Sequence, residues 1–120
     1  MKPTFTDDRG TITDVLLEHV DAVTHITFTE GAVRGNHFHR KTIQYDYVLY
    51  GELMLVTKKY PSAKQDDAEI IRPGTLITHK RGTAHAYKAL TDACILSMTR
   101  GPRRGPSYEC DTYRLKKPLL

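Results

Sequence analysis

The sequence predicts an all-β protein with one domain, built as an antiparallel sandwich or barrel. Short segments rich in Val, Ile, Thr, Leu and Tyr recur along the chain, which is typical of strands. Clusters of Gly, Pro or charged residues separate these segments at short intervals, as turns do. No stretch has a convincing helical repeat, and the best candidate, Leu16–Val23, is short. Many evenly spaced short strands favour a sandwich or a barrel.

Each expected strand lies between two turn signals. In chain order the expected strands are Thr11–Leu17, Val23–Thr29, Gly35–Phe38, Gln44–Tyr50, Leu53–Lys58, Ala68–Ile71, Leu76–Thr78, Ala84–Ala89 and Ala93–Thr99. Turn signals include Asp7–Gly10 before the first strand and Arg72–Gly74 in the middle of the chain. The segment Arg100–Pro106 is predicted to be irregular because it repeats Gly and Pro.

Size and composition exclude several classes of function. The 120 residues suit one ordinary domain with a buried core. The net charge of +4 suits an anionic small molecule but is too diffuse to predict a nucleic acid partner. No apolar stretch is long enough to span a membrane, and the N-terminal residues have no apolar signal-peptide core. We therefore expect a cytoplasmic protein with no membrane partner.

The two cysteines are expected to be unpaired. Cys94 lies in an apolar run and Cys110 lies in a polar tail. The chain has no Cys-x-x-Cys spacing, so a cysteine-based zinc site is not expected. A cytoplasmic compartment also favours free thiols over a disulfide.

Histidines at strand spacing form the most informative pattern in the sequence. His37 and His39 are two residues apart, so a strand would place both rings on one face. His85 lies far downstream in another predicted strand, and Gln44 follows shortly after the first pair. Imidazoles together with an amide or carboxylate oxygen are suitable ligands for a divalent transition metal. The pattern therefore predicts a candidate metal site.

The spacing of these histidines and of the flanking glycines resembles the two sequence motifs of cupins. The first motif is Gly, five residues, His-x-His, three or four residues, Glu, six residues and Gly. Its positions correspond here to Gly31, His37, His39, Gln44 and Gly51. The second motif is Gly, five residues, Pro-x-Gly, two residues, His, three residues and Asn. Its positions correspond here to Gly74, Lys80, Gly82, His85 and Ala89, so its Pro and Asn are missing.

The resemblance implies a double-stranded β-helix, the jelly-roll barrel of the cupins, as a single domain over residues 1–120. The core motifs would lie at residues 31–51 and 74–89. The matching metal ligands would be His37, His39, Gln44 and His85, around one divalent cation: Zn, Ni, Fe, Mn or Cu. Gln44 stands where cupins usually have Glu. A neutral amide is a weaker ligand and leaves the site more positive, which favours a substrate with its own negative oxygen.

A second likeness covers the segments DDRGTITDV and VRGNHFHRK. They look like the cupins of sugar-nucleotide and polysaccharide biosynthesis, which include ketoisomerases and epimerases acting on nucleotide-linked keto-deoxysugars. The ketoisomerases of this group are described as metal-independent, with histidine as the base. Because His85 is retained, we expect this chain to keep the metal arrangement instead.

The strand after the histidine pair leaves two orientations open. Gln44 has the opposite strand parity from the histidines, so it joins them only if the chain turns or bulges within residues 40–43. If Gln44 points inward, Asp46 shares its face, and a buried carboxylate needs a partner and has a raised pKa. Asp46 would then be a candidate general acid or base. In the shifted register, Tyr45 and Tyr47 face the core and Asp46 faces solvent.

Three further residues are candidates for the site. Tyr87 shares a strand face with His85, so it either lines the cavity as a catalytic group or packs as an ordinary aromatic residue. His79 either binds substrate or lies in a solvated loop. Arg34 is placed on the opposite face from His37 by strand counting, but a bulge near a barrel mouth would allow it to bind an anionic substrate.

The densest basic cluster consists of Arg100, Arg103 and Arg104. Guanidinium groups suit phosphate, although an exposed run of charge is the simpler interpretation.

Two classes of function remain open on the sequence alone. The first is a metal-dependent enzyme of the isomerase or epimerase type, which moves a proton beside a carbonyl of a small polar carbohydrate or sugar-nucleotide-like substrate. An Fe(II) dioxygenase acting on a small metabolite is an alternative enzyme. The second class is a non-catalytic module that binds a sugar or metabolite.

We also expect a homodimer. The C-terminal tail, residues 100–120, is rich in Tyr and Leu and has no obvious partner within one barrel. The tail or an edge strand is therefore the expected contact.

Overall fold

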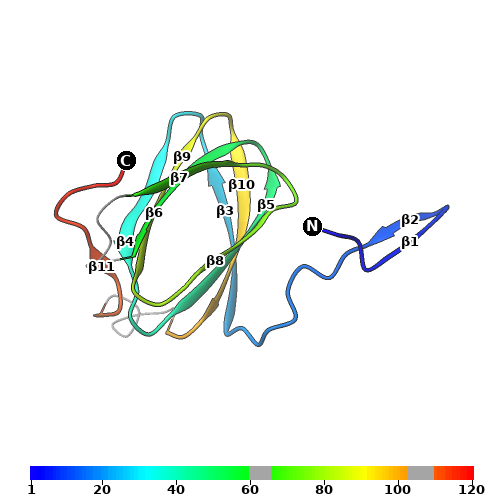
Figure 1. Ribbon diagram of the computed structural model, residues 1–120, viewed down its shortest axis with the longest axis horizontal. Coiled ribbons are helices and arrows are strands. Elements are labelled where there is room, and N and C mark those ends of the chain that lie inside the picture. Colours follow the sequence, from blue (N-terminus) through cyan, green and yellow to red (C-terminus); the bar gives the residue numbers. More distant parts are fainter. Residues whose placement is uncertain (60–65, 103–109) are drawn as a thin grey trace.

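A computed structural model describes residues 1–59, 66–102 and 110–120 of the chain. Its main body is a flattened barrel of two facing antiparallel sheets, and a separate hairpin projects from it (Figure 1). The hairpin consists of β1 (Phe5–Asp7) and β2 (Gly10–Ile12). One sheet has the order β3 (Ala22–Phe28), β10 (Ala93–Arg100), β5 (Ile43–Tyr50) and β8 (Leu76–His79). The other has the order β11 (Tyr113–Arg114), β4 (Val33–Phe38), β9 (Thr83–Ala89), β6 (Leu53–Lys59) and β7 (Asp67–Ile71). The predicted all-β jelly roll is confirmed.

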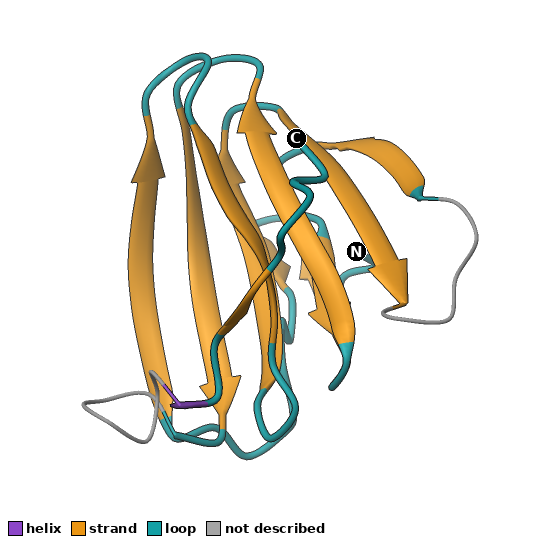
Figure 2. Cartoon of the chain, turned by 90° about the vertical axis from the view of Figure 1, so that its left-hand side faces the viewer, coloured by secondary structure: helices purple, strands orange, loops and turns teal. Residues whose placement is uncertain are grey.

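The core lies between the two sheets (Figure 2). Strand alternation places apolar side chains of both sheets in this space, and the β6 pair Leu53 and Leu55 shows it, with exposures of 0% and 2%. Burying side chains of this size contributes about 1.5–3 kcal/mol each. The buried cluster consists of Phe28, Val48, Leu53, Leu55, Ile71, Tyr87, Ala89, Ala93 and Ile95. Tyr87 belongs to this cluster and also reaches the polar part of the interior.

The strand predictions succeed in the middle of the chain and fail at its ends. The predicted strand Thr11–Leu17 is wrong beyond Ile12, because only Gly10–Ile12 pairs, with Phe5–Asp7 across the predicted turn. Residues 13–21 form neither strand nor helix, which agrees with the judgement that the repeat at Leu16–Val23 is not convincing. Strand β11 was also not predicted.

A bulge in β4 re-aims the side chains that follow it. The register between β4 and β9 shifts between Gly35 and His37, and Asn36 has φ 58°. Gly35 has φ 98°, and a Cβ added to it would lie 2.8 Å from the carbonyl oxygen of His85. Only glycine therefore allows β4 to approach β9 so closely here. The bulge places Arg34 and His37 on the same side of β4, where both line the pocket.

The C-terminal tail contacts its own barrel, contrary to expectation. Strand β11 pairs with β4, and the Tyr113 ring stacks on Phe38 with 5.0 Å between ring centroids. The Asn36 side-chain oxygen accepts hydrogen bonds from the backbone N–H groups of Leu119 at 2.7 Å and Leu120 at 3.2 Å. The described part of the tail therefore packs against β4 of its own chain.

Two other sequence predictions can be placed. Cys94 is buried, Cys110 is exposed, and both are free thiols, as expected. Arg103 and Arg104 lie outside the described residues. Within the described ranges, no helix is long and apolar enough to cross a membrane.

The projecting hairpin leads us to propose a dimer contact different from the predicted one. Phe5 and Ile12 are cross-strand partners and are 53% and 61% exposed. An isolated two-stranded hairpin is marginally stable in water, so a second copy of the chain is the partner we expect to cover it. We expect the parent protein to be a dimer in light scattering and the Phe5→Ser/Ile12→Ser variant to be a monomer. The control is Ile70→Ser, on the exposed face of β7. A monomeric parent would contradict the proposal.

Candidate functional site

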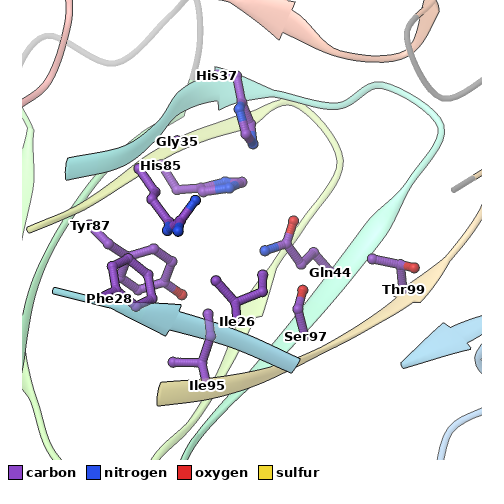
Figure 3. Close-up of a pocket in the computed structure, with 11 residues that line it drawn as sticks. Ile26, Phe28, Gly35, His37, Gln44, His85, Tyr87, Ile95, Ser97 and Thr99 are labelled. Carbon is purple, nitrogen blue, oxygen red and sulfur yellow. The ribbon is translucent and has the colours of Figure 1, made fainter. Parts of the chain in front are cut away.

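A pocket opens between the two sheets and contains most of the candidate residues. Its cavity volume is about 80 Å³, and it opens partly to solvent. Its lining comes from β3, β4, β5, β9 and β10: Ile26, Phe28, Arg34, Gly35, His37, Gln44, His85, Tyr87, Ile95, Ser97 and Thr99. Figure 3 shows an apolar side made by Phe28, Ile26 and Ile95, with His37, Gln44 and Thr99 farther along.

The three histidines predicted to act together do converge. His37 and His85 are register partners across β4 and β9, and their ring centroids lie 4.7 Å apart. His39 follows the end of β4, with its ring centroid 4.9 Å from that of His37 and 6.2 Å from that of His85. His39 and His85 are buried, at 4% and 2% exposure. The fold therefore gathers three imidazoles from two distant sequence segments.

Burial makes two of these rings neutral at physiological pH. Desolvation lowers the pKa of His37 to about 4, and the nearby charges of His39 and Arg114 act in the same direction. Desolvation also holds the pKa of His85 well below its ordinary value, with His79 and His37 contributing. A neutral imidazole has a lone pair, which can accept a proton or bind a metal.

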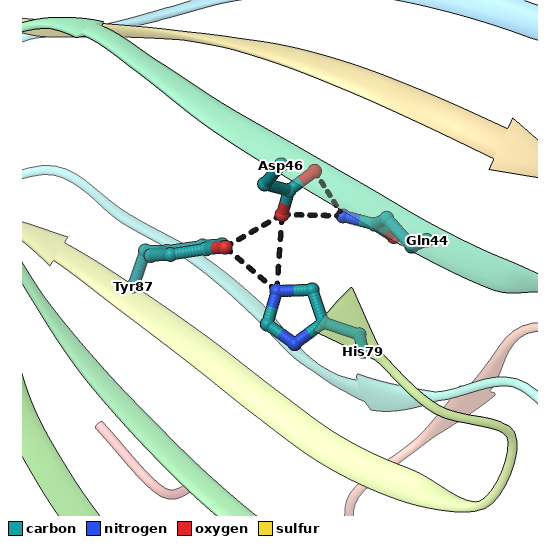
Figure 4. A network of polar contacts seen from close by, with 4 residues as sticks. All are labelled: Gln44, Asp46, His79 and Tyr87. Atoms are coloured by element: carbon teal, nitrogen blue, oxygen red, sulfur yellow. Dashed lines mark hydrogen bonds and ion pairs between the residues drawn. The ribbon is translucent and has the colours of Figure 1, made fainter. Parts of the chain in front are cut away.

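Behind the pocket lies a buried polar network centred on Asp46, whose exposure is 0% (Figure 4). The Tyr87 hydroxyl donates to Asp46 Oδ2 at 2.6 Å. His79 Nε2 lies 3.0 Å from the same oxygen and 2.7 Å from the Tyr87 hydroxyl oxygen. Since a carboxylate only accepts, Nε2 of His79 must carry a proton. The Gln44 amide nitrogen donates to both Asp46 oxygens, at 3.0 and 2.9 Å.

This network settles the orientation of Asp46 and corrects its expected pKa. Asp46 faces inward, as one of the two registers predicted. Burial raises its pKa, but hydrogen bonds from His79, Tyr87 and Ser97, together with the charge of His79, outweigh burial and lower the pKa below its ordinary value. The predicted rise is therefore wrong, because the carboxylate has more donors than the sequence revealed. Burial and the neighbouring Asp46 raise the pKa of Tyr87 well above its ordinary value, so Tyr87 keeps its proton.

The network also gives a physical reason for Gln44. A glutamate at this position would place a second carboxylate about 3 Å from Asp46 in a water-poor environment, where two like charges repel strongly. An amide instead supplies a donor to Asp46. Its nitrogen faces Asp46, so its carbonyl oxygen is the atom available to the pocket. The turn at residues 39–42 that brings Gln44 toward the histidines is present, as the parity argument required.

His79 and Arg34 have surroundings that the sequence left open. His79 ends β8 and is 3% exposed, so it does not lie in a solvated loop, and its ring stacks on His85 at 4.1 Å between centroids. Arg34 lines the pocket, with its guanidinium carbon 5.4 Å from the centroid of the Phe28 ring. Arg34 also donates to the backbone carbonyl of Thr27 at 3.1 Å.

The donor set matches a transition metal in kind but not in spacing. His37 and His85 each have a buried Nδ1 atom without a hydrogen-bond partner, and unpaired imidazole nitrogens are what a metal binds. Across the described residues, however, no three His, Cys, Asp or Glu side chains are positioned to hold one ion. The metal remains a prediction.

Sequence reasoning missed several residues of the site. Phe28 and Thr99 line the pocket from strands outside the two motifs, and the Thr99 hydroxyl is buried without a partner. Asp111, in the tail, contacts the turn after β4. Nothing in the local sequence marks these residues, because only contacts between distant segments bring Phe28 and Thr99 to the pocket and Asp111 to the turn.

Comparisons with known proteins agree with this architecture. The family model described as Cupin matches residues 10–102. No curated protein matches the chain significantly.

Three solved structures illustrate the likeness. CapF, a capsular polysaccharide assembling protein from Staphylococcus aureus, has a TM-score of 0.71 and 19% identity, over 94% of this chain and 34% of CapF. The dTDP-4-dehydrorhamnose 3,5-epimerase from Sulfolobus tokodaii has a TM-score of 0.71 and 19% identity, over 85% of this chain and 68% of that one. QdtA, a sugar 3,4-ketoisomerase from Thermoanaerobacterium thermosaccharolyticum in complex with TDP, has a TM-score of 0.75 and 18% identity, over 93% of this chain and 82% of QdtA. This chain thus spans about a third of CapF, and at such identities the likeness shows the fold alone.

Proposed function

The chain belongs to the cupin family, and from that premise we propose that it is an isomerase or epimerase acting on a small polar carbohydrate or sugar-nucleotide-like substrate. The reaction is a proton transfer beside a carbonyl group. One observation carries the proposal: a pocket holds neutral imidazoles next to a protonated tyrosine that is backed by a buried carboxylate. Two fold neighbours are named as a sugar-nucleotide epimerase and a sugar ketoisomerase, which supports the choice of substrate class.

Each pocket residue has a role in the proposed reaction. A neutral His37 or His85 removes a proton from the carbon next to the carbonyl, the electron pair of the C–H bond forms a C=C bond, and the carbonyl π pair moves onto the oxygen. The Tyr87 hydroxyl turns its hydrogen from Asp46 to that oxygen and stabilises its developing charge by a hydrogen bond. Return of the proton to a carbon completes an isomerisation or epimerisation without any redox reagent. Arg34, at the pocket wall, is placed to pair with an anionic group of the substrate.

Asp46 and His79 act through Tyr87 in this proposal. Asp46 has zero exposure and is not among the residues that line the pocket, so it does not touch a substrate there. Its lowered pKa keeps it ionised, which makes it an acceptor that orients the Tyr87 hydroxyl before the substrate carbonyl takes its hydrogen bond. We therefore assign Asp46 to positioning rather than to general acid or base chemistry, and we treat His79 in the same way.

We further propose that one divalent transition metal binds among His37, His39, Gln44 and His85, whose side chains would have to move closer together to hold it. The neutral histidines and the Gln44 carbonyl oxygen supply suitable ligand atoms. When bound, such an ion would polarise the substrate carbonyl. Elemental analysis of the purified protein tests this: we expect a stoichiometric metal in the parent and its loss in His37→Ala.

The Tyr87→Phe variant tests the proposed reaction. We expect turnover to fall by about 10²–10⁴-fold with little change in KM, because the variant removes a proton donor but leaves the ring in place. The assay follows solvent deuterium entering a TDP-linked keto-deoxysugar by NMR. The matched control is Tyr50→Phe, whose ring is exposed at the end of β5.

Other outcomes of that assay would favour the alternative functions. Oxygen uptake with Fe(II) would favour the dioxygenase. Binding of the sugar nucleotide without deuterium entry or product would favour the non-catalytic module. A Tyr87→Phe variant as active as the parent would contradict the role assigned to Tyr87.

A further inference from the structure

The tail holds the turn that follows β4, next to the histidines. The Asp111 carboxylate is 2% exposed and accepts three hydrogen bonds from consecutive residues of that turn. Its Oδ1 accepts from the backbone N–H groups of Arg40 at 3.0 Å and Lys41 at 2.9 Å. Its Oδ2 accepts from the Thr42 hydroxyl at 2.8 Å. These bonds fix the backbone of Asp111 relative to the turn.

The backbone of Asp111 in turn contacts the ring of His39. The distance between His39 Nδ1 and the Asp111 carbonyl oxygen is 2.9 Å, and the contact is buried. A carbonyl oxygen only accepts hydrogen bonds, so Nδ1 must be the donor and must carry the proton. On the other side, the His39 carbonyl oxygen accepts from the Gly82 N–H at 2.6 Å, which fixes the backbone under the ring.

We propose that Asp111 is a positioning residue that sets the tautomer of His39. When the ring is neutral, this contact holds it in the Nδ1–H form, which places the lone pair on Nε2. A hydrogen bond to one ring nitrogen commonly selects the atom of a histidine that serves as base or ligand. The tail is therefore part of the site rather than an attachment to its outside. The consequence for chemistry rests on the proposed function, whereas the tautomer itself does not.

The two halves of the Asp111 contact have separate tasks. The backbone carbonyl selects the tautomer, and the side chain keeps that carbonyl within reach of the ring. Burial raises the pKa of Asp111, but hydrogen bonds donated by Thr42, Lys41 and Arg40 hold it below its ordinary value. The Asp111 carboxylate therefore stays charged. Removal of the side chain releases the carbonyl although the ring of His39 is unchanged.

The experiment reads the tautomer directly by NMR of the protein labelled with ¹⁵N-histidine, as purified and after dialysis against a chelator. The His39 signals are assigned by their absence in His39→Gln. In the parent we expect Nδ1 of His39 to give the signal of a protonated nitrogen and Nε2 that of a nitrogen with a lone pair. In Asp111→Ala we expect the Nε2–H form to become populated. Thr42→Val, which removes one of the three bonds, should give a smaller shift in the same direction.

The control is Lys117→Ala, an exposed position of the same tail, which should leave the His39 signals at their parent positions. A parent ring in the Nε2–H form would overturn the inference even if both tail variants fail to fold. A folded Asp111→Ala with the parent tautomer would overturn it as well. Failure of the proposed function is a separate result: the parent would show the Nδ1–H form and still exchange no deuterium into a keto sugar.

Discussion

Replacing Asp46 with alanine is expected to lower the free energy of unfolding by about 3–5 kcal/mol at pH 7, because it breaks a buried charged network by removing one partner. Tyr87, His79 and Gln44 would each lose their shared acceptor. A buried donor left without an acceptor costs about 1–3 kcal/mol. Urea unfolding followed by far-ultraviolet circular dichroism measures the change. Asp67→Ala, at an exposed position of β7, is the control and should stay within about 0.5 kcal/mol of the parent.

The contribution of Asp46 to stability should depend on pH in a definite direction. The pKa of Asp46 is lower in the folded chain than its ordinary value, so the folded state binds fewer protons than the unfolded state near pH 4. Its contribution is complete above the ordinary carboxyl pKa of about 3.9 and is lost as pH falls through the lower, folded value. The difference in free energy of unfolding between the parent and Asp46→Ala should therefore become smaller in acid. If the two proteins have the same free energy of unfolding at pH 7, the network does not stabilise the fold.

Replacing Gln44 with glutamate is expected to have the opposite pH dependence. The new carboxylate would lie beside Asp46 where the amide now donates, and two desolvated like charges cannot both ionise without cost. The variant should hold a proton with a raised folded pKa. Relative to the parent, its stability should fall as pH rises from about 4.3, the ordinary glutamate pKa, to that raised value, and the difference should then level off. We expect a loss of about 2–4 kcal/mol at pH 8, with recovery toward pH 5.

The control for this prediction is Gln44→Ala. It also removes the donor to Asp46 but adds no charge, so the difference between its stability and that of the parent should stay constant between pH 5 and 8. Measuring urea midpoints of both variants across that range separates repulsion from simple loss of a hydrogen bond. If Gln44→Glu shows the same constant difference from the parent as Gln44→Ala, the position of the amide against Asp46 is wrong.

The sequence predicted the parts of the site that depend on local periodicity. Alternation along a strand was enough to place Tyr87 with His85 and to name an inward Asp46 as one of two registers. It also identified the turn needed to bring Gln44 back toward His37, because parity alone excluded a continuous strand. Such features depend on a few neighbouring residues, so a short stretch of sequence is enough to predict them.

Other features depend on distant pairing and could not be read from local patterns. The pKa of Asp46 falls because donors come from β8, β9 and β10 as well as from its own strand. The glycine of the bulge, Gly35, can be seen in the sequence. The reason for it cannot, because it allows β4 to approach the backbone of His85 on another strand. The role of Asp111 likewise arises only when the tail meets β4. In each case the deciding contact joins residues that are far apart in the chain.

The attachment of the tail to Asn36 has a consequence for the order of folding. Its side chain joins residues 83 positions apart in the sequence. Closing so long a loop costs conformational entropy before any contact rewards it, and non-local pairings of this kind slow folding. Within the described barrel only β6 and β7 pair as neighbours in sequence, so that hairpin can form first, whereas Asn36 and the tail are among the most widely separated partners. The contact between the tail and the segment around His39 therefore forms late in folding, when the C-terminal tail first meets β4.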